Sequence, residues 1–108
     1  MANYNVNNIF PRPTWFGSSA VAGQGLTVTS TAAVSFTRTF NNSTDMVVLD
    51  VQTANTYATF DGTTPSAGAA HVLYAGNAYT WSRQAAQQAK FVATTTTNAT
   101  IWASEFQT

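Results

Sequence analysis

Charged residues are scarce in this sequence, and cysteine is absent. Only 7% of the 108 residues are charged, with four acids and four bases, against roughly 25% in ordinary soluble domains. Without cysteine the chain forms neither a disulfide nor a thiolate metal site. A surface with so little net charge is poorly protected against self-association. The composition therefore fits a protein that works inside an assembly.

The same scarcity argues against two classes of partner. The basic residues Arg12, Arg38, Arg83 and Lys90 are spread thinly along the chain, whereas phosphate contacts need clustered Lys and Arg. No apolar run approaches the roughly twenty residues that span a bilayer. Residues 1–13 lack the basic and apolar regions of a secretory signal, so we expect synthesis in the cytoplasm without Sec export. We expect neither nucleic acid nor a membrane as the partner.

Residues suited to catalysis or metal binding are equally few. Asp61 and His71 flank one loop, and a nearby Ser or Thr would complete a nucleophile, base and acid set. Nothing in their spacing forces these groups to converge. The acids Asp50, Asp61 and Glu105 are too scattered to predict a metal site, and residues 23–25 lack the third glycine of a dinucleotide fingerprint. We predict no catalytic residue, no cofactor and no metal.

The chain opens with an irregular segment rich in Asn and aromatic residues. Residues 10–13, Phe-Pro-Arg-Pro, favour an extended path, and the Gly-, Ser- and Ala-rich residues 17–25 indicate a linker. Large rings in a segment without periodicity need a surface, on their own domain or on a neighbouring subunit. We predict an arm and linker over residues 1–25. The expected partner-binding residues of the arm are Tyr4, Ile9, Phe10, Arg12, Trp15 and Phe16.

From residue 26 onward, alternating apolar residues and frequent Thr predict a series of short β-strands. The run 46–51 is apolar at successive positions at its start, which favours a central strand covered on both faces. Residues 82–89 tolerate a helix but are too short for a stable one, so we expect a loop with at most one helical turn. The expected strands cover 26–30, 34–40, 46–51, 57–60, 71–74, 78–81, 90–94 and 100–106, the last two forming a hairpin.

This spacing of strands and turns predicts one all-β domain over residues 26–108, an antiparallel sandwich or jelly-roll-like barrel. Its expected core consists of Val47, Leu49, Val51, Phe91 and Ile101.

The longest loop of the predicted domain follows residues 57–60. Asp61-Gly62 is a strong turn signal, because Gly tolerates positive φ and Asp can bond to nearby backbone. We predict that Gly62 has positive φ and that Asp61, Gly62 and Pro65 are structural turn residues. Ala75-Gly76-Asn77 indicates a second turn before the next strand.

The aromatic residues leave a second binding function open. Flat rings of Trp and Tyr can stack on pyranose sugars, although in a small β-domain they more often fill a core or an interface. The candidates for such stacking are Trp15, Trp81, Trp102, Tyr57, Tyr74 and Tyr79.

Residues 60–65, FDGTTP, are followed by a small-residue loop, His71-Val72-Leu73 and Ala75-Gly76. This order resembles small all-β virion proteins of tailed bacteriophages, which carry a strand, a DG-T-P turn, a loop, H-x-L and x-G. Their pattern continues with a late apolar strand, like residues 90–93, and a Thr-rich final hairpin, like residues 94–106. The similarity covers roughly residues 45–106 and leaves the arm unmatched.

The resemblance implies a structural role without catalytic residues. Members of this group are similar to capsid cement or decoration proteins, and also to neck, tail or fibre components. Many of them have Pro before the Gly, where this chain has Ala75-Gly76. We expect a capsid decoration protein that binds the major capsid protein on the particle exterior and forms homo-oligomers there. The alternatives are a neck, tail or fibre component and a carbohydrate-binding module.

Overall fold

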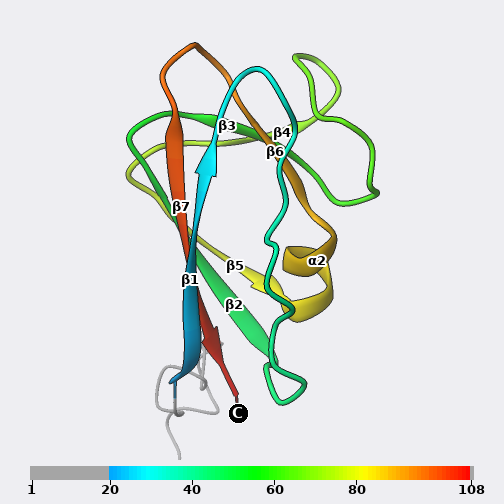
Figure 1. Cartoon of the computed structure of the whole chain (residues 1–108), viewed down its shortest axis with the longest axis vertical. Coiled ribbons are helices and arrows are strands. Elements are labelled where there is room, and N and C mark those ends of the chain that lie inside the picture. The colour runs from blue at the N-terminus through cyan, green and yellow to red at the C-terminus, as the bar shows by residue number, and fades with distance from the viewer. Residues whose placement is uncertain (1–19, 108) are drawn as a thin grey trace, which may run out of the picture.

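Most of the runs of alternating apolar and Thr residues form strands in the computed structural model, which describes residues 20–107 (Figure 1). The predicted partner-binding residues of the arm lie outside these described residues. One short helix, α2 (Arg83–Gln88), interrupts the strands. The strands are β1 (Ala20–Val28), β2 (Met46–Gln52), β3 (Thr56–Thr59), β4 (His71–Leu73), β5 (Ala78–Ser82), β6 (Lys90–Ala93) and β7 (Ala99–Phe106).

The strands form two antiparallel sheets. The larger sheet has the order β1-β7-β2-β5, and the smaller has the order β4-β3-β6. Figure 1 shows the smaller sheet at one end of the long β1 and β7 strands. Buried side chains from both sheets form one core. The structure therefore confirms an all-β protein with two antiparallel sheets.

The core follows the period-two alternation of the central strands. Val47, Leu49 and Val51 of β2 are fully buried, as are Phe91 of β6 and Ile101 of β7. This result confirms the predicted core. The other face of β2 is only half-buried, so the prediction of a strand covered on both faces was wrong. β2 is central within its sheet, between β7 and β5, but it contributes one face alone to the core.

The predicted linker is partly wrong, because β1 already begins at Ala20. This part of β1 pairs with β7, from Ala20 opposite Phe106 to Gly25 opposite Trp102. Gly23 pairs with Ser104. Glycine is a poor strand former, which is why the composition indicated a loop. Here the ring of Trp102 on β7 covers the two glycines.

The predicted hairpin of the last two strands is also wrong. β6 pairs with β3 in the small sheet, and β7 pairs with β1 and β2 in the large sheet. Residues 94–98 therefore connect the two sheets. The amide of Ala93 donates to the carbonyl of Thr29 and that of Thr94 to the carbonyl of Asn55, so neither amide is available to a hairpin with β7.

Residues 29–45 run alongside the sheets without the strand that we predicted over 34–40 (Figure 1). Val34 alone forms a β-bridge, with Phe91. Phe36 and Phe40 point into the core, with their ring centroids 5.4 Å apart. The amide of Phe40 donates to Gln87 Oε1 (2.7 Å). This segment is therefore held mainly by side chains instead of a partner strand. Its apolar alternation reflects the burial of the two rings and the packing of Val34 against the core.

Helix α2 is slightly longer than the single turn that we expected. Ser82 caps its start, since the Ser82 hydroxyl accepts a hydrogen bond from the amide of Ala85 (3.2 Å). Ala86 and the following Ala89 are buried in the core. The helix is therefore stabilised by its cap and by packing, as expected for a sequence too short to form a helix alone.

Candidate functional site

The loop between β3 and β4 begins with a turn built on Asp61. One carboxylate oxygen of Asp61 accepts hydrogen bonds from the Thr63 amide (3.1 Å) and the Thr63 hydroxyl (2.6 Å). These bonds from Thr63 lower the pKa of Asp61. Thr59 closes the turn by donating its hydroxyl to the Thr63 carbonyl (2.6 Å). Gly62 has φ +85°, which confirms its predicted backbone conformation.

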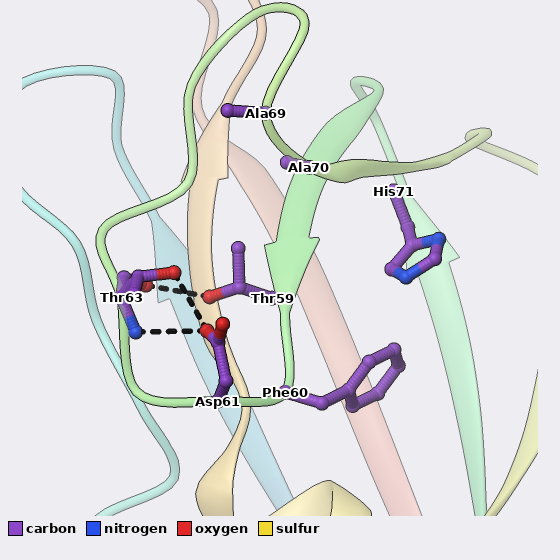
Figure 2. Close-up of a pocket in the computed structure, with 7 residues that line it drawn as sticks. All are labelled: Thr59, Phe60, Asp61, Thr63, Ala69, Ala70 and His71. Atoms are coloured by element: carbon purple, nitrogen blue, oxygen red, sulfur yellow. Dashed lines mark hydrogen bonds between the residues drawn. The ribbon is translucent and has the colours of Figure 1, made fainter.

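The same loop borders a pocket of about 450 Å³. His71 packs against Phe60 with ring centroids 5.4 Å apart, and Phe60 packs edge-on against Trp81 at 4.4 Å. Pro65 is buried and fixes the loop against the domain. The pocket is lined by Thr59, Phe60, Asp61, Thr63, Ala69, Ala70 and His71 (Figure 2).

The pocket does not bring the two titratable residues of the loop together. Figure 2 shows the carboxylate of Asp61 beside Thr63, and the imidazole of His71 beside Phe60 on the other side of the pocket. Asp61 is engaged in the turn, and the His71 ring is in a tilted contact with the Phe60 ring. Within residues 20–107, no group of three or more His, Asp or Glu side chains is arranged to hold a metal ion. The described contacts of Asp61 and His71 therefore hold the loop in place.

A buried acid on β7 is a feature that sequence reasoning missed. Glu105 is fully buried at the end of the core. One of its carboxylate oxygens accepts hydrogen bonds from the Asn41 amide and the Thr44 hydroxyl (both 2.8 Å). The other forms an ion pair with Arg38 (2.9 Å). Burial alone would raise the pKa of Glu105, but these bonds together hold it below its ordinary value.

Glu105 holds residues 38–44 against the end of the large sheet. Arg38 also donates to the carbonyl of Gly23 in β1 (3.2 Å), and its own carbonyl accepts from Gln24 Nε2 (3.0 Å). The position was readable from the sequence, because Glu105 has the same parity in its strand as the predicted core residue Ile101. The contacts make Glu105 a structural anchor.

The exposed face of the large sheet carries the second candidate site. Trp102 of β7 is 47% exposed there, opposite Gly25 on β1 and Asp50 on β2. We call this surface the Trp102 face. From the register of the four strands, its central residues are Gly23, Gly25, Val48, Asp50, Gln52, Ala78, Thr80, Thr100, Trp102 and Ser104.

The other candidate aromatic residues for sugar stacking are placed differently. Trp81 is half-buried and packs against the core, parallel to Phe91 at 6.1 Å. Tyr79 also packs on the core, and its hydroxyl accepts a hydrogen bond from the Tyr74 amide (2.9 Å). Tyr57 is half-buried and Tyr74 is exposed at the end of β4. Trp15 lies outside the described residues. Among the candidates that the structure describes, Trp102 is therefore the one with an exposed ring on a sheet face.

Comparison with protein-family models, curated proteins and solved structures finds no match for this chain. In the part of the chain that the structure describes, no helix is long and apolar enough to cross a membrane.

Proposed function

We propose that this protein is a non-enzymatic structural component of a bacteriophage virion, a cement or decoration protein that binds the major capsid protein on the particle exterior. The observation that carries the proposal is the role of the residues that resemble phage virion proteins. Asp61 and Gly62 form a turn, Pro65 is buried, and Gly76 has φ +88° in the turn before β5. Each of these residues has a structural role, which suits a protein that functions by binding to other proteins.

The surface of the small sheet supports binding by contact. Tyr57 lies between Val72 and Val92 in the register of its three strands, so the three side chains share one face. Val72 is 36% exposed and the other two are partly exposed. Aromatic and aliphatic side chains at the centre of a patch, with a charged residue at its edge, are typical of protein interfaces. Lys90, which pairs with Thr59 two residues from Tyr57, is the charged residue at the edge of this row. We propose this row as one contact with the capsid.

The N-terminal arm is the second proposed contact. We propose that residues before β1 reach a neighbouring subunit, so that copies of the protein form homo-oligomers on the particle. The chain enters β1 at Ala20, opposite Phe106 at the end of the large sheet. A jelly-roll-like arrangement of the sheets is part of the same proposal, since such sandwiches serve as capsid domains.

Purified particles of the phage that encodes this chain provide the test. We expect mass spectrometry to find the protein in the particles and gold-labelled antibodies to mark the whole capsid surface. Particles lacking the protein should bind added protein until saturated, while complete particles should bind little. Val72→Asp should weaken this binding, and Thr95→Asp, in the exposed loop that follows β6 and outside the row, should not.

Two outcomes contradict the proposal. Absence of the protein from purified particles would exclude a virion role. Labelling confined to one vertex or to the tail would instead assign the protein to the neck, tail or fibre.

A further inference from the structure

The indole of Trp102 lies across two glycines of the neighbouring strand. A Cβ atom added at Gly23 would stand 2.8 Å from Trp102 Cζ2, and one added at Gly25 would stand 3.3 Å from Cε3. The ring therefore covers both positions, with atoms from each side of the indole close to the backbone of β1. Because Trp102 is still 47% exposed, its outer side faces solvent as a flat apolar platform.

The residues beside this platform are small and able to form hydrogen bonds. Trp102 pairs with Gly25 on one side and with Asp50 on the other, and Asp50 pairs with Ala78 on β5. Thr100 and Ser104 lie two residues away on the same face of β7. Gln52 Nε2 donates to Asp50 Oδ2 (2.9 Å), which holds the carboxylate among these groups. No bulky side chain stands next to the ring in this row of paired residues.

We propose that the Trp102 face is a binding site for a neutral oligosaccharide of glucose-type rings. A pyranose ring with equatorial hydroxyls has two apolar C–H faces and a polar rim. The Trp102 platform matches the apolar face, and Asp50, Gln52, Thr100 and Ser104 are placed to accept or donate hydrogen bonds at the rim. Asp50 is the one charged residue among those that define the face, so it disfavours acidic sugars.

The chemistry of the surroundings favours a saccharide over a protein partner. Protein interfaces usually surround an aromatic anchor with side chains that exclude water from a packed pocket. The Trp102 ring instead lies on an open sheet face, bordered by hydroxyl, amide and carboxylate groups. An open face gives each sugar ring little contact area, so a chain of several sugars should bind better than one. The inference goes beyond the virion role and does not depend on it.

Calorimetric titration of the full chain with cellohexaose tests the site. We expect saturable binding, weaker binding of glucose, and no binding of hexagalacturonate, which has the same length but carries carboxylates. Trp102→Thr keeps a strand-forming residue and removes the ring, so cellohexaose binding should weaken about tenfold or more. Tyr74→Ala removes another exposed aromatic ring, one that is not among the residues that define the face, and should leave binding unchanged.

A second variant tests the geometry while the indole is kept. Gly23→Ala places a Cβ where the ring now lies, so the ring must shift and cellohexaose binding should weaken. Circular dichroism melts of each variant establish that the domain is folded before titration. The proposal is overturned if cellohexaose does not bind the wild-type protein, if Trp102→Thr binds it equally well, or if hexagalacturonate binds as tightly. If Trp102→Thr still binds cellohexaose but no longer attaches to particles, the Trp102 face is a protein contact and the proposal is wrong.

Discussion

Gly62 is the residue on which the β3–β4 loop turns. Its φ of +85° is one that residues with a side chain rarely adopt, and no atom lies within 4 Å of an added Cβ. Gly62→Ala should therefore destabilise the fold by about 1 kcal/mol through backbone strain alone. Urea denaturation measures the change. Gly62→Asn is the matched control, and it should cost less because Asn tolerates positive φ.

Equal stability of wild type and Gly62→Ala would show that the loop rearranges freely at this turn.

Leu49 shows at the same scale how strongly one face of β2 is buried. Its side chain is fully buried, whereas the adjacent Val48 is half-buried on the Trp102 face. Leu49→Ala should lower the free energy of unfolding by about 2–5 kcal/mol, because it leaves a cavity in the core. Val48→Ala should cost clearly less, since its side chain is already partly in water. Chemical denaturation of both variants measures this difference, and similar costs would contradict the one-sided burial of β2.

At the scale of elements, Glu105 links β7 to residues 38–44, which have no partner strand. The Glu105→Gln variant keeps the shape of the side chain but removes the charge that faces Arg38, the Asn41 amide and the Thr44 hydroxyl. We expect a loss of about 1–3 kcal/mol at neutral pH, the usual range for hydrogen bonds to charged groups. Thermal melts of the two proteins measure the loss.

The effect of Glu105 should depend on pH in a defined direction. Its pKa in the folded protein is lowered from the ordinary value of 4.5, so the folded state favours the ionised form. The stabilisation is complete above pH 4.5 and is lost as the pH falls through the lower pKa of the folded state. The stability difference between wild type and Glu105→Gln should therefore shrink in acid. A difference that stays constant down to pH 2 would contradict the ionised anchor.

The strands themselves were largely predictable, whereas their partners were not. Alternation placed Val47, Leu49 and Val51 on one buried face, because a strand repeats every two residues. The same pattern carries no information about which strands pair. β6 and β7 are adjacent in sequence, yet they lie in different sheets, and the backbone bonds from Ala93 and Thr94 that separate them involve distant residues.

The candidate sites differ in the same way. The turn at Asp61-Gly62 was predictable because its hydrogen bonds are local. The Trp102 face was not, since it depends on the register that sets Trp102 opposite Gly25 and Asp50. Gly23 and Gly25 indicated a loop when considered alone. When β1 pairs with β7, the missing side chains of these two glycines leave the space that the Trp102 ring occupies.

At the scale of the whole molecule, the protein has two parts. The two sheets form the folded domain, and the N-terminal arm is the segment proposed to bind a neighbouring subunit. The described core draws its buried residues from positions between Val28 and Ala103. The arm residues Tyr4 to Phe16 precede β1, so removing them leaves every described strand complete. Fixing such a segment costs about 1–2 kcal/mol per residue in backbone entropy. Burial of its aromatic rings on a neighbouring subunit would offset that cost.

Deletion of residues 2–16 tests this division. We expect the shortened protein to keep a cooperative thermal melt and the β-type circular dichroism of the full chain, because β1 begins only at Ala20. Its occupancy on particles, measured by co-sedimentation, should fall sharply. A variant with Phe10, Trp15 and Phe16 replaced by Ser keeps the length of the arm and should show the same loss. Wild-type occupancy of the shortened protein would refute the arm as an attachment, and loss of the cooperative melt would show that the arm belongs to the fold.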